Sequence, residues 1–158
     1  MKRVIIGIGS NKGDRVKSII KAIKELEKIG KIKKISSFYE NEPVNVSGGY
    51  FLNGVIEIDV NFSPEKLLNI LINIEKNIGR KFPHKKEDER EIDLDIIFYE
   101  DKIIKNENLE IPHPEYKKRI FVLKPLCEIE PDFIDPETGE KIKDIYRNLK
   151  NEDMQKNI

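Results

Sequence analysis

Cysteine, tryptophan, net charge and long apolar runs are all scarce or absent in this sequence of 158 residues. The single cysteine, Cys127, cannot form a disulfide within the chain, which is typical of a reducing compartment. Basic and acidic residues number 29 each, so net charge gives no general reason to expect a nucleic-acid partner. No apolar stretch is long enough to span a bilayer. We therefore expect a cytoplasmic protein that binds neither nucleic acid nor membrane.

Several familiar motifs are missing as well. No histidine–cysteine cluster has the spacing of a zinc site, and no serine or cysteine nucleophile pattern occurs. The run from Gly7 to Gly13 resembles a phosphate-binding loop only loosely. It lacks the Walker spacing and the Gly-Lys-Ser/Thr ending, so we reject that interpretation. The apolar run near Met1 is too short and too broken by glycines for a signal peptide.

Hydrophobic periodicity predicts the secondary structure of the first part of the chain. Strands are expected at 3–9, 31–39, 51–60 and 92–98, and helices at 14–29 and 64–78. This order, strand-helix-strand-strand-helix-strand, is that of the split ferredoxin-like α+β unit, with both helices on one face of an antiparallel sheet.

The rest of the chain is expected to extend this core. Asp101 is expected to turn a hairpin, followed by a short strand near 107–111. The C-terminal extension reads as helical and irregular, with a turn at 135–139. We expect residues 1–158 to form one domain.

A pair of aspartates in the last predicted strand of the core attracts most attention. The even positions from Ile92 to Phe98 are apolar, so Asp93 and Asp95 project together from the opposite face. Two neighbouring carboxylates repel each other unless a cation lies between them. Mg²⁺ is commonly held by one or two carboxylates plus substrate phosphates. Two solvated acids on an exposed sheet face remain the alternative.

Basic residues surround the aspartate pair in the sequence. Arg80 and Arg90 bracket a charged segment, and Lys118 and Arg119 follow His113, which lies between two prolines. Guanidinium groups match phosphate oxygens and stabilise charge in phosphoryl transfer. Each arginine could equally be a surface ion-pair partner, and the histidine a structural residue.

Three further residues suit ligand binding. Glu75 borders the apolar stripe of its predicted helix, either as an edge residue or as an acceptor for a ligand. Phe51 and Asn53 share one face of their predicted strand. A ring beside an amide could stack on and hydrogen-bond a flat heterocycle.

These residues and several short motifs occur together in one order. The chain resembles the 6-hydroxymethyl-7,8-dihydropterin pyrophosphokinases of folate biosynthesis from about residue 3 to about residue 148. The motifs that carry the resemblance are Gly9-Ser10-Asn11, Ser36-Ser37-Phe38-Tyr39, Phe51-Leu52-Asn53, Glu75, Gly79-Arg80, Arg90, Asp93-Leu94-Asp95-Ile96, Pro112-His113, Arg119 and Pro125-Leu126.

The resemblance implies an ATP- and Mg²⁺-dependent enzyme. Such an enzyme transfers the β,γ-pyrophosphoryl group of ATP to the hydroxymethyl oxygen of the pterin and releases AMP. Asp93 and Asp95 match the ligands of two Mg²⁺ ions, and Arg80 and Arg90 match catalytic arginines on or beside a mobile loop. Both substrates are small molecules, and we expect a monomer.

The resemblance also implies the residues that bind each substrate. Those at ATP-binding positions are Glu75, Arg90, His113 and Arg119. Those at pterin-binding positions are Asn41, Glu42, Val44, Phe51, Asn53 and Phe121, with the two aromatic rings sandwiching the pterin.

Two departures from the family pattern stand out. Relatives often carry an Arg-Trp-Gly-Pro-Arg-like run before the aspartates, where this chain has the acidic segment 86–90 and no tryptophan. Asn108 occupies the position of an arginine that often lies near the ATP phosphates.

Two other classes of protein remain possible from the residues alone. A non-catalytic ferredoxin-like module would bind a ligand or partner and would consume no ATP. A different metal-dependent phosphotransferase or phosphohydrolase could use the same scaffold; an ordinary kinase would release ADP rather than AMP.

Overall fold

The computed structural model describes residues 1–42, 49–79 and 91–156, and these form an α+β fold. In chain order the elements are β1 (Lys2–Ser10), α1 (Arg15–Ile29), β2 (Gly30–Ile35), β3 (Tyr39–Asn41), β4 (Phe51–Val60), α2 (Pro64–Ile78), β5 (Asp93–Tyr99), β6 (Ile104–Lys105), β7 (Glu110–Ile111), the 3₁₀ helix η1 (Tyr116–Lys118), α3 (Ile120–Ile129) and α4 (Ile142–Lys156). None of the helices in these three ranges is both long and apolar enough to cross a membrane.

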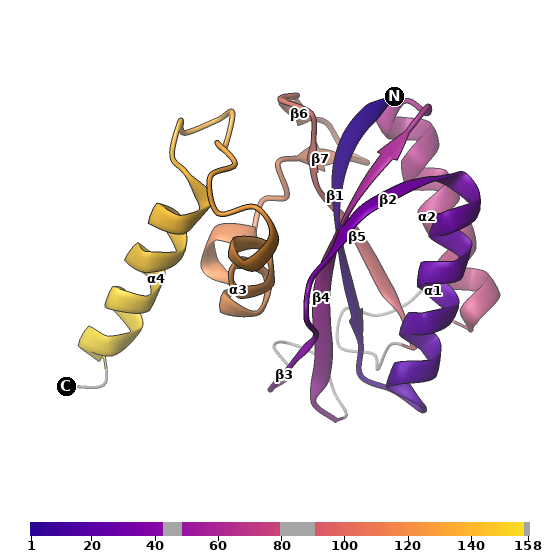
Figure 1. The fold of residues 1–158 in the computed structure, drawn as a ribbon, viewed down its shortest axis with the longest axis horizontal. Helices are drawn as coiled ribbons and strands as arrows, with labels where there is room; N and C mark the ends of the chain where they lie inside the picture. The colour runs from indigo at the N-terminus through magenta and orange to yellow at the C-terminus, as the bar shows by residue number, and fades with distance from the viewer. Residues whose placement is uncertain (43–48, 80–90, 157–158) are drawn as a thin grey trace.

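The main sheet is antiparallel, with the strand order β2-β4-β1-β5 and with β3 also paired to β4. Apart from the short β3, this is the predicted ferredoxin-like core. Figure 1 shows α1 and α2 on one face of the sheet and the later helices α3 and α4 on the other. The C-terminal extension therefore covers the face that the first two helices leave open.

Both core helices begin at a capping side chain, and α2 also ends at a capping glycine. The Asp14 carboxylate accepts a hydrogen bond from the Lys17 amide at 3.0 Å and caps α1. Ser63 caps α2 in the same way, with Pro64 at its first position. Gly79 ends α2 with a φ of 123°, a conformation that favours glycine, and its amide bonds the carbonyls of the last turn.

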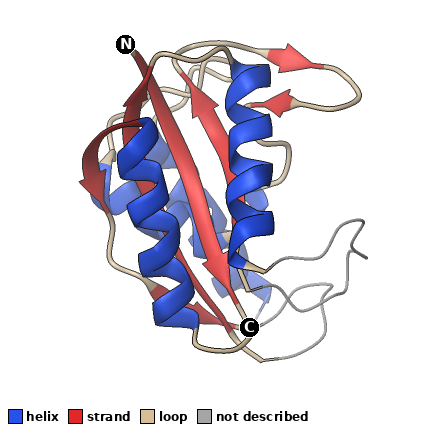
Figure 2. Cartoon of the chain, turned by 90° about the vertical axis from the view of Figure 1, so that its right-hand side faces the viewer, coloured by secondary structure: helices blue, strands red, loops and turns tan. Residues whose placement is uncertain are grey.

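The two faces of the sheet bury separate apolar clusters. Val4, Ile6 and Ile8 of β1 pack under α1 and α2, whereas Ile5 packs on the other face with residues of α3 and α4. Figure 2 shows α1 and α2 running along the sheet. The predicted alternation in 51–60 is confirmed, because Ile56, Ile58 and Val60 join the first cluster and Val55 the second.

Strand β5 departs from simple alternation. Ile5 pairs with Phe98 and Ile6 with Ile96, so Ile97 is an extra residue in β5. Because of this irregularity, Ile97 and Phe98 both pack in the cluster under α3 and α4. The expectation that Phe98 shares a face with Ile96 is therefore wrong, whereas the aspartates precede the irregularity and keep the predicted facing.

The predicted strand 31–39 is divided in two. Ser36 lies between β2 and β3, and its amide donates to the Val55 carbonyl at 3.0 Å. The Ser36 hydroxyl accepts from the Val55 amide at 2.9 Å, so a side chain replaces the backbone acceptor there. A pattern of apolar residues cannot predict that a side-chain hydroxyl takes the place of a backbone acceptor.

The hairpin expected at Asp101 lies further along the chain. A turn follows β5 there, but β6 pairs with β7 in a separate two-stranded sheet. Asn106 makes that second turn, because its Oδ1 accepts from the Asn108 and Leu109 amides at 3.0 and 2.9 Å. The short strand expected near 107–111 is confirmed only at Glu110–Ile111.

A charged cluster fastens the end of α3 to the sheet. Glu130 lies 2.8 Å from the Arg3 guanidinium and 2.7 Å from the Lys34 ammonium, and Arg3 also bonds Glu57 at 3.1 Å. Burial, followed by the hydrogen bond with Glu130, raises the pKa of Glu57. Burial acts in the same direction on Glu130, but hydrogen bonds from Glu57, Lys34 and Arg3 outweigh it and lower its pKa to about 2.

Candidate active site

The aspartate pair lies where the sequence places it. Asp93 and Asp95 are half-buried on the α3 side of β5, whereas Leu94 and Ile96 between and after them join the core under α1 and α2. Neighbouring β1 places glycines opposite both of them, since Gly9 pairs with Asp93 and Gly7 with Asp95. Residues directly opposite in an antiparallel pair point to the same face. No side chain on β1 therefore stands beside either carboxylate.

Gly9 also faces a residue on its other side. It pairs with Asn53 of β4, and Asn53 pairs in turn with Tyr39 of β3. One row across the sheet thus runs Asp93, Gly9, Asn53, Tyr39. A Cβ on Gly9 would collide with the Asn53 side-chain oxygen and lie 3.5 Å from a ring carbon of Phe51. This part of the sheet is a shallow floor bordered by carboxylates on one side and by a ring and an amide on the other.

The Asn53 amide is held in a fixed orientation. Its Nδ2 donates a short hydrogen bond to Asn41 Oδ1, and Asn41 Nδ2 donates to the Glu42 carbonyl at 3.0 Å. The Asn53 oxygen, which lies nearest the missing Cβ of Gly9, is thereby turned toward the floor. Phe51 on the same strand is 8% exposed. The arrangement can accept a hydrogen bond from a flat ligand lying on the glycines.

Glu75 is buried beside the aspartates rather than at a helix edge. It is 3% exposed, and its Oε2 accepts the Leu94 amide at 2.8 Å. Leu94 lies between the two aspartates, on the strand that forms the outer edge of the main sheet among the described residues. The carboxylate satisfies an amide at that outer edge and so fixes the stretch of backbone that carries both aspartates.

His113 approaches β5 from the segment after β7. Its amide donates to the Ile97 carbonyl at 3.0 Å, and its Nδ1 accepts from the Glu115 amide at 3.1 Å. Burial is the largest cause that lowers the pKa of His113 to about 4, followed by the charge of Arg119, while Asp93 opposes both. The imidazole is therefore neutral at pH 7, and its proton lies on Nε2, which is left as a donor.

Arg119 and Phe121 lie where η1 meets α3. Arg119 ends η1 and precedes α3, and its guanidinium carbon is 5.8 Å from the centre of the Phe121 ring. The charges of Arg119 and Asp93 both act on the pKa of His113, so these two groups lie near the imidazole. Helix α3, whose second residue is Phe121, packs against β3 and β4.

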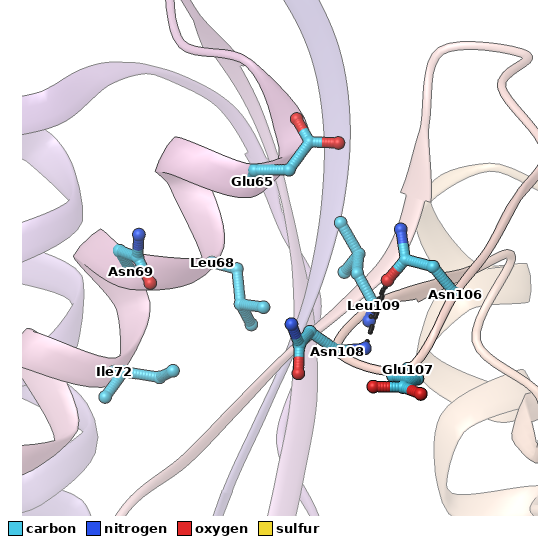
Figure 3. A pocket seen from close by; sticks show the side chains of 8 residues that line it. All are labelled: Glu65, Leu68, Asn69, Ile72, Asn106, Glu107, Asn108 and Leu109. Carbon is cyan, nitrogen blue, oxygen red and sulfur yellow. Dashed lines mark hydrogen bonds between the residues drawn. The ribbon is translucent and has the colours of Figure 1, made fainter.

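A cavity of about 690 Å³ opens beyond the outer edge of β5 (Figure 3). It lies between α2 and the β6–β7 turn, and the lining side chains are those of Glu65, Leu68, Asn69, Ile72, Asn106, Glu107, Asn108 and Leu109. Its volume is in the range of small-molecule sites. Ile72 precedes Glu75 by three residues on α2, so one helix face runs from this cavity to the aspartates.

Comparison with known proteins identifies the family. Residues 5–131 match the family model described as 7,8-dihydro-6-hydroxymethylpterin-pyrophosphokinase. The chain belongs to this family. The 2-amino-4-hydroxy-6-hydroxymethyldihydropteridine pyrophosphokinase of Aquifex aeolicus is 41% identical over 145 residues, which cover 91% of this chain and 90% of that protein. The corresponding protein of a Synechocystis strain is 36% identical over 87% of this chain and 71% of its own length.

Some relatives are much longer than this pyrophosphokinase. The folic acid synthesis protein fol1 of Pneumocystis carinii is 41% identical over 96% of this chain but only 20% of its own length. The crystal structure of Plasmodium falciparum HPPK-DHPS with pteroate shares the fold, with a TM-score of 0.78 at 16% identity. That match covers 99% of this chain and 46% of the larger one.

Membership of the family gives the activity of the chain. The protein is a pyrophosphokinase of folate biosynthesis, and it transfers the pyrophosphoryl group of ATP to 6-hydroxymethyl-7,8-dihydropterin. It therefore uses ATP and a pterin as small-molecule substrates.

Three expected site residues of this pyrophosphokinase, Val44, Arg80 and Arg90, lie outside the described residues. Of the others, Glu75 and His113 bond the backbone of β5, whereas Asn41, Phe51 and Asn53 lie on β3 and β4, across β1 from it. Sequence reasoning missed that Gly7 and Gly9 lie opposite the two aspartates. The signal was available, since Gly-x-Gly in one predicted strand has the same period as Asp-x-Asp in another.

Proposed function

We propose that pyrophosphoryl transfer takes place beside Gly9, on the α3 side of the sheet, with Asp93 and Asp95 as the ligands of Mg²⁺. The observation that carries this proposal is the register of β1 and β5, which sets a glycine opposite each aspartate. In the described parts of the chain, no group of three or more His, Cys, Asp or Glu side chains could hold a metal ion. Two carboxylates completed by phosphate oxygens suit Mg²⁺ and do not suit a closed zinc site.

The bound Mg²⁺ would neutralise charge on the ATP phosphates, which is the largest need of phosphoryl transfer. The remaining contacts with the phosphate oxygens would come from side chains. His113 offers a neutral Nε2 donor, and Arg119 offers a permanent cation near Asp93. Both groups suit the oxygens of a triphosphate. Arg80 and Arg90 are proposed to act in catalysis on the strength of the family resemblance.

The pterin is proposed to lie on the glycine floor beside Asn53. The Asn53 amide nitrogen is engaged by Asn41, so its oxygen is the group available to accept from a pterin N–H. Phe51 would stack on one side of the ring, and Phe121 at the start of α3 on the other. Asn41, Glu42 and Val44 would complete this side of the site through the short strand β3 and the segment that follows it.

The nucleoside of ATP is proposed to occupy the cavity between α2 and the β6–β7 turn. Leu68, Ile72 and Leu109 give it apolar walls, and asparagine amides lie at its rim (Figure 3). From there the face of α2 leads to Glu75 and hence to the aspartates. An ATP molecule lying along this path would bring its phosphates to the end of β5.

The test is turnover by aspartate variants. Asp93→Asn and Asp95→Asn should each lower kcat at least about 100-fold, because charge stabilisation at the reacting phosphates is lost. The matched control is Asp59→Asn, at the other end of β4. AMP should form only when pterin and Mg²⁺ are both present. Undiminished turnover in both site variants would overturn the metal assignment, and formation of ADP would contradict the transfer of pyrophosphate.

A further inference from the structure

A fully buried acid of the C-terminal extension lies outside the site described so far. Asp135 has an exposed fraction of 0% and follows the segment matched by the family model, which ends at residue 131. Its two carboxylate oxygens have separate partners. Oδ1 accepts from the Glu137 and Thr138 amides at 2.6 and 3.3 Å. Oδ2 accepts a short hydrogen bond from the Tyr116 hydroxyl and lies 3.8 Å from the Lys117 ammonium.

The first set of contacts makes a rigid turn. The Gly139 amide donates to the Asp135 carbonyl at 2.8 Å, and Gly139 has a φ of 75°. Phe133, just before the turn, packs its ring 4.6 Å from that of Phe98 on β5. The carboxylate is therefore held in place relative to the sheet, and its second oxygen points at Tyr116 from a fixed position.

Tyr116 makes this contact from the first position of η1. Its side chain is also fully buried, and its ring meets Phe98 edge-on with 5.0 Å between centres. Its carbonyl accepts the Arg119 amide at 3.2 Å. Tyr116 thus lies between His113 and Arg119, the two groups proposed to face the triphosphate, and sets the backbone of the second.

We propose that Asp135 and Tyr116 are positioning residues for the ATP half of the site, acting through His113 and Arg119. The proposal rests on the ATP-binding role given to those two residues above. A fully buried carboxylate needs a donor in any case, so the effect on the two substrates, and not the hydrogen bond alone, separates positioning from stability. Here the hydrogen bond fixes the rotation of η1, and with it the direction in which Arg119 leaves the helix.

The sharpest variant is Tyr116→Phe, which removes one oxygen atom and keeps the buried ring. The KM for ATP should rise about 10-fold, because a small misplacement of binding groups is costly. The dissociation constant of the pterin should stay within about twofold, since the floor between β4 and β5 is untouched. Asp135→Ala should give the same split between the two substrates.

Two controls separate positioning from stability. Tyr99→Phe also removes a buried tyrosine hydroxyl, one that donates to the Phe62 carbonyl at 2.5 Å in the cluster under α1 and α2. It should lower the melting temperature without changing the KM for ATP. Asp135→Asn should restore ATP binding relative to Asp135→Ala, because its amide oxygen can serve the turn while its NH₂ donates to the Tyr116 oxygen.

The outcomes are distinct. If Tyr116→Phe changes the KM for ATP no more than Tyr99→Phe does, or raises both substrate constants equally, the positioning role is refuted. Arg119→Ala tests the underlying proposal separately. An unchanged KM for ATP in Arg119→Ala would show that the ATP site lies elsewhere, whatever Tyr116→Phe does.

Discussion

The glycine floor leads to a sharp prediction at Gly9. In Gly9→Ala, the added methyl would collide with the Asn53 side-chain oxygen, and the nearest ring carbon of Phe51 lies 3.5 Å away. The backbone of Gly9 is not in the left-handed region, so alanine meets no conformational strain there. The substitution therefore acts on a neighbouring side chain and not on the strand.

The expected size follows from the contact that is displaced. Asn53 must rotate away, and this breaks its hydrogen bond to Asn41 and withdraws its oxygen from the floor. Loss of a buried hydrogen bond costs about 1–3 kcal/mol. Pterin binding should then weaken between about 5- and 150-fold, while ATP binding stays unchanged. The stability loss should be smaller, because replacing glycine by alanine restricts the unfolded chain by about 0.4–1 kcal/mol.

The assay is a double-mutant cycle on the pterin dissociation constant, measured by titration calorimetry. Asn53→Ala alone should weaken binding to a similar extent. In the Asn53→Ala background, Gly9→Ala should add little, because the atom that it displaces is already absent. Additive effects would show that the methyl blocks the ligand directly. Unchanged affinity in Gly9→Ala would refute the position of the pterin itself.

Three other predictions address the rest of the site. In an NMR titration, the His113 imidazole should titrate near pH 4, because burial and then Arg119 lower its pKa. This folded-state pKa lies below the unfolded value, so the residue's contribution to stability should be lost as pH falls from about 6.5 to about 4; a midpoint above 6 would contradict this. Glu75→Leu should lower the free energy of unfolding by about 1–3 kcal/mol and raise the Mg²⁺ concentration needed for half-maximal rate. Glu75→Gln keeps an acceptor for the Leu94 amide, so both effects should be smaller in that variant. Glu128→Ala should lower the free energy of unfolding by less than about 1 kcal/mol, because the contact that Glu128 makes is exposed. It should still raise the KM for the pterin, since Glu128 accepts from the Tyr39 hydroxyl at 2.7 Å and so fixes β3. An unchanged KM for the pterin would show that β3 is not part of the site.

The regular parts of the fold could be predicted because local patterns determine them. The strand 51–60 and the helix that begins after Ser63 have unbroken periodicity and clear capping residues, and the structure confirms both. The errors occur where a single side chain or an extra residue changes the pairing. Ser36 divides a predicted strand, and Ile97 reverses the facing of Phe98. Neither event alters the hydrophobicity of the sequence.

The common face of the two carboxylates could be predicted from the sequence, but the residues that surround them could not. Period two gives the common face of Asp93 and Asp95 directly from the sequence. The glycines opposite them depend on which strands are neighbours and in what register, which is a long-range property. The role of Asp135 was even less predictable, because an acid in a turn sequence indicates only a turn. Its contact with Tyr116 spans two segments that no local pattern connects.

On the α3 side of the sheet, the first half of β1 packs against the C-terminal extension and the second half lies beside the proposed site. Toward the start of β1, Arg3 and Ile5 lie under the C-terminal extension, which fastens itself there through ion pairs and aromatic packing. Two and four residues further on, Gly7 and Gly9 lie opposite the aspartates; Ile97 packs over Gly7, and Gly9 lies beside the Asn53 side chain. Without the extension, this face of the sheet would be exposed to solvent. Side chains in place of the glycines would crowd Ile97 and collide with Asn53. The extension thus does more than cover apolar surface, because its buried Asp135 also accepts a hydrogen bond from Tyr116, on the segment that leads to the proposed site.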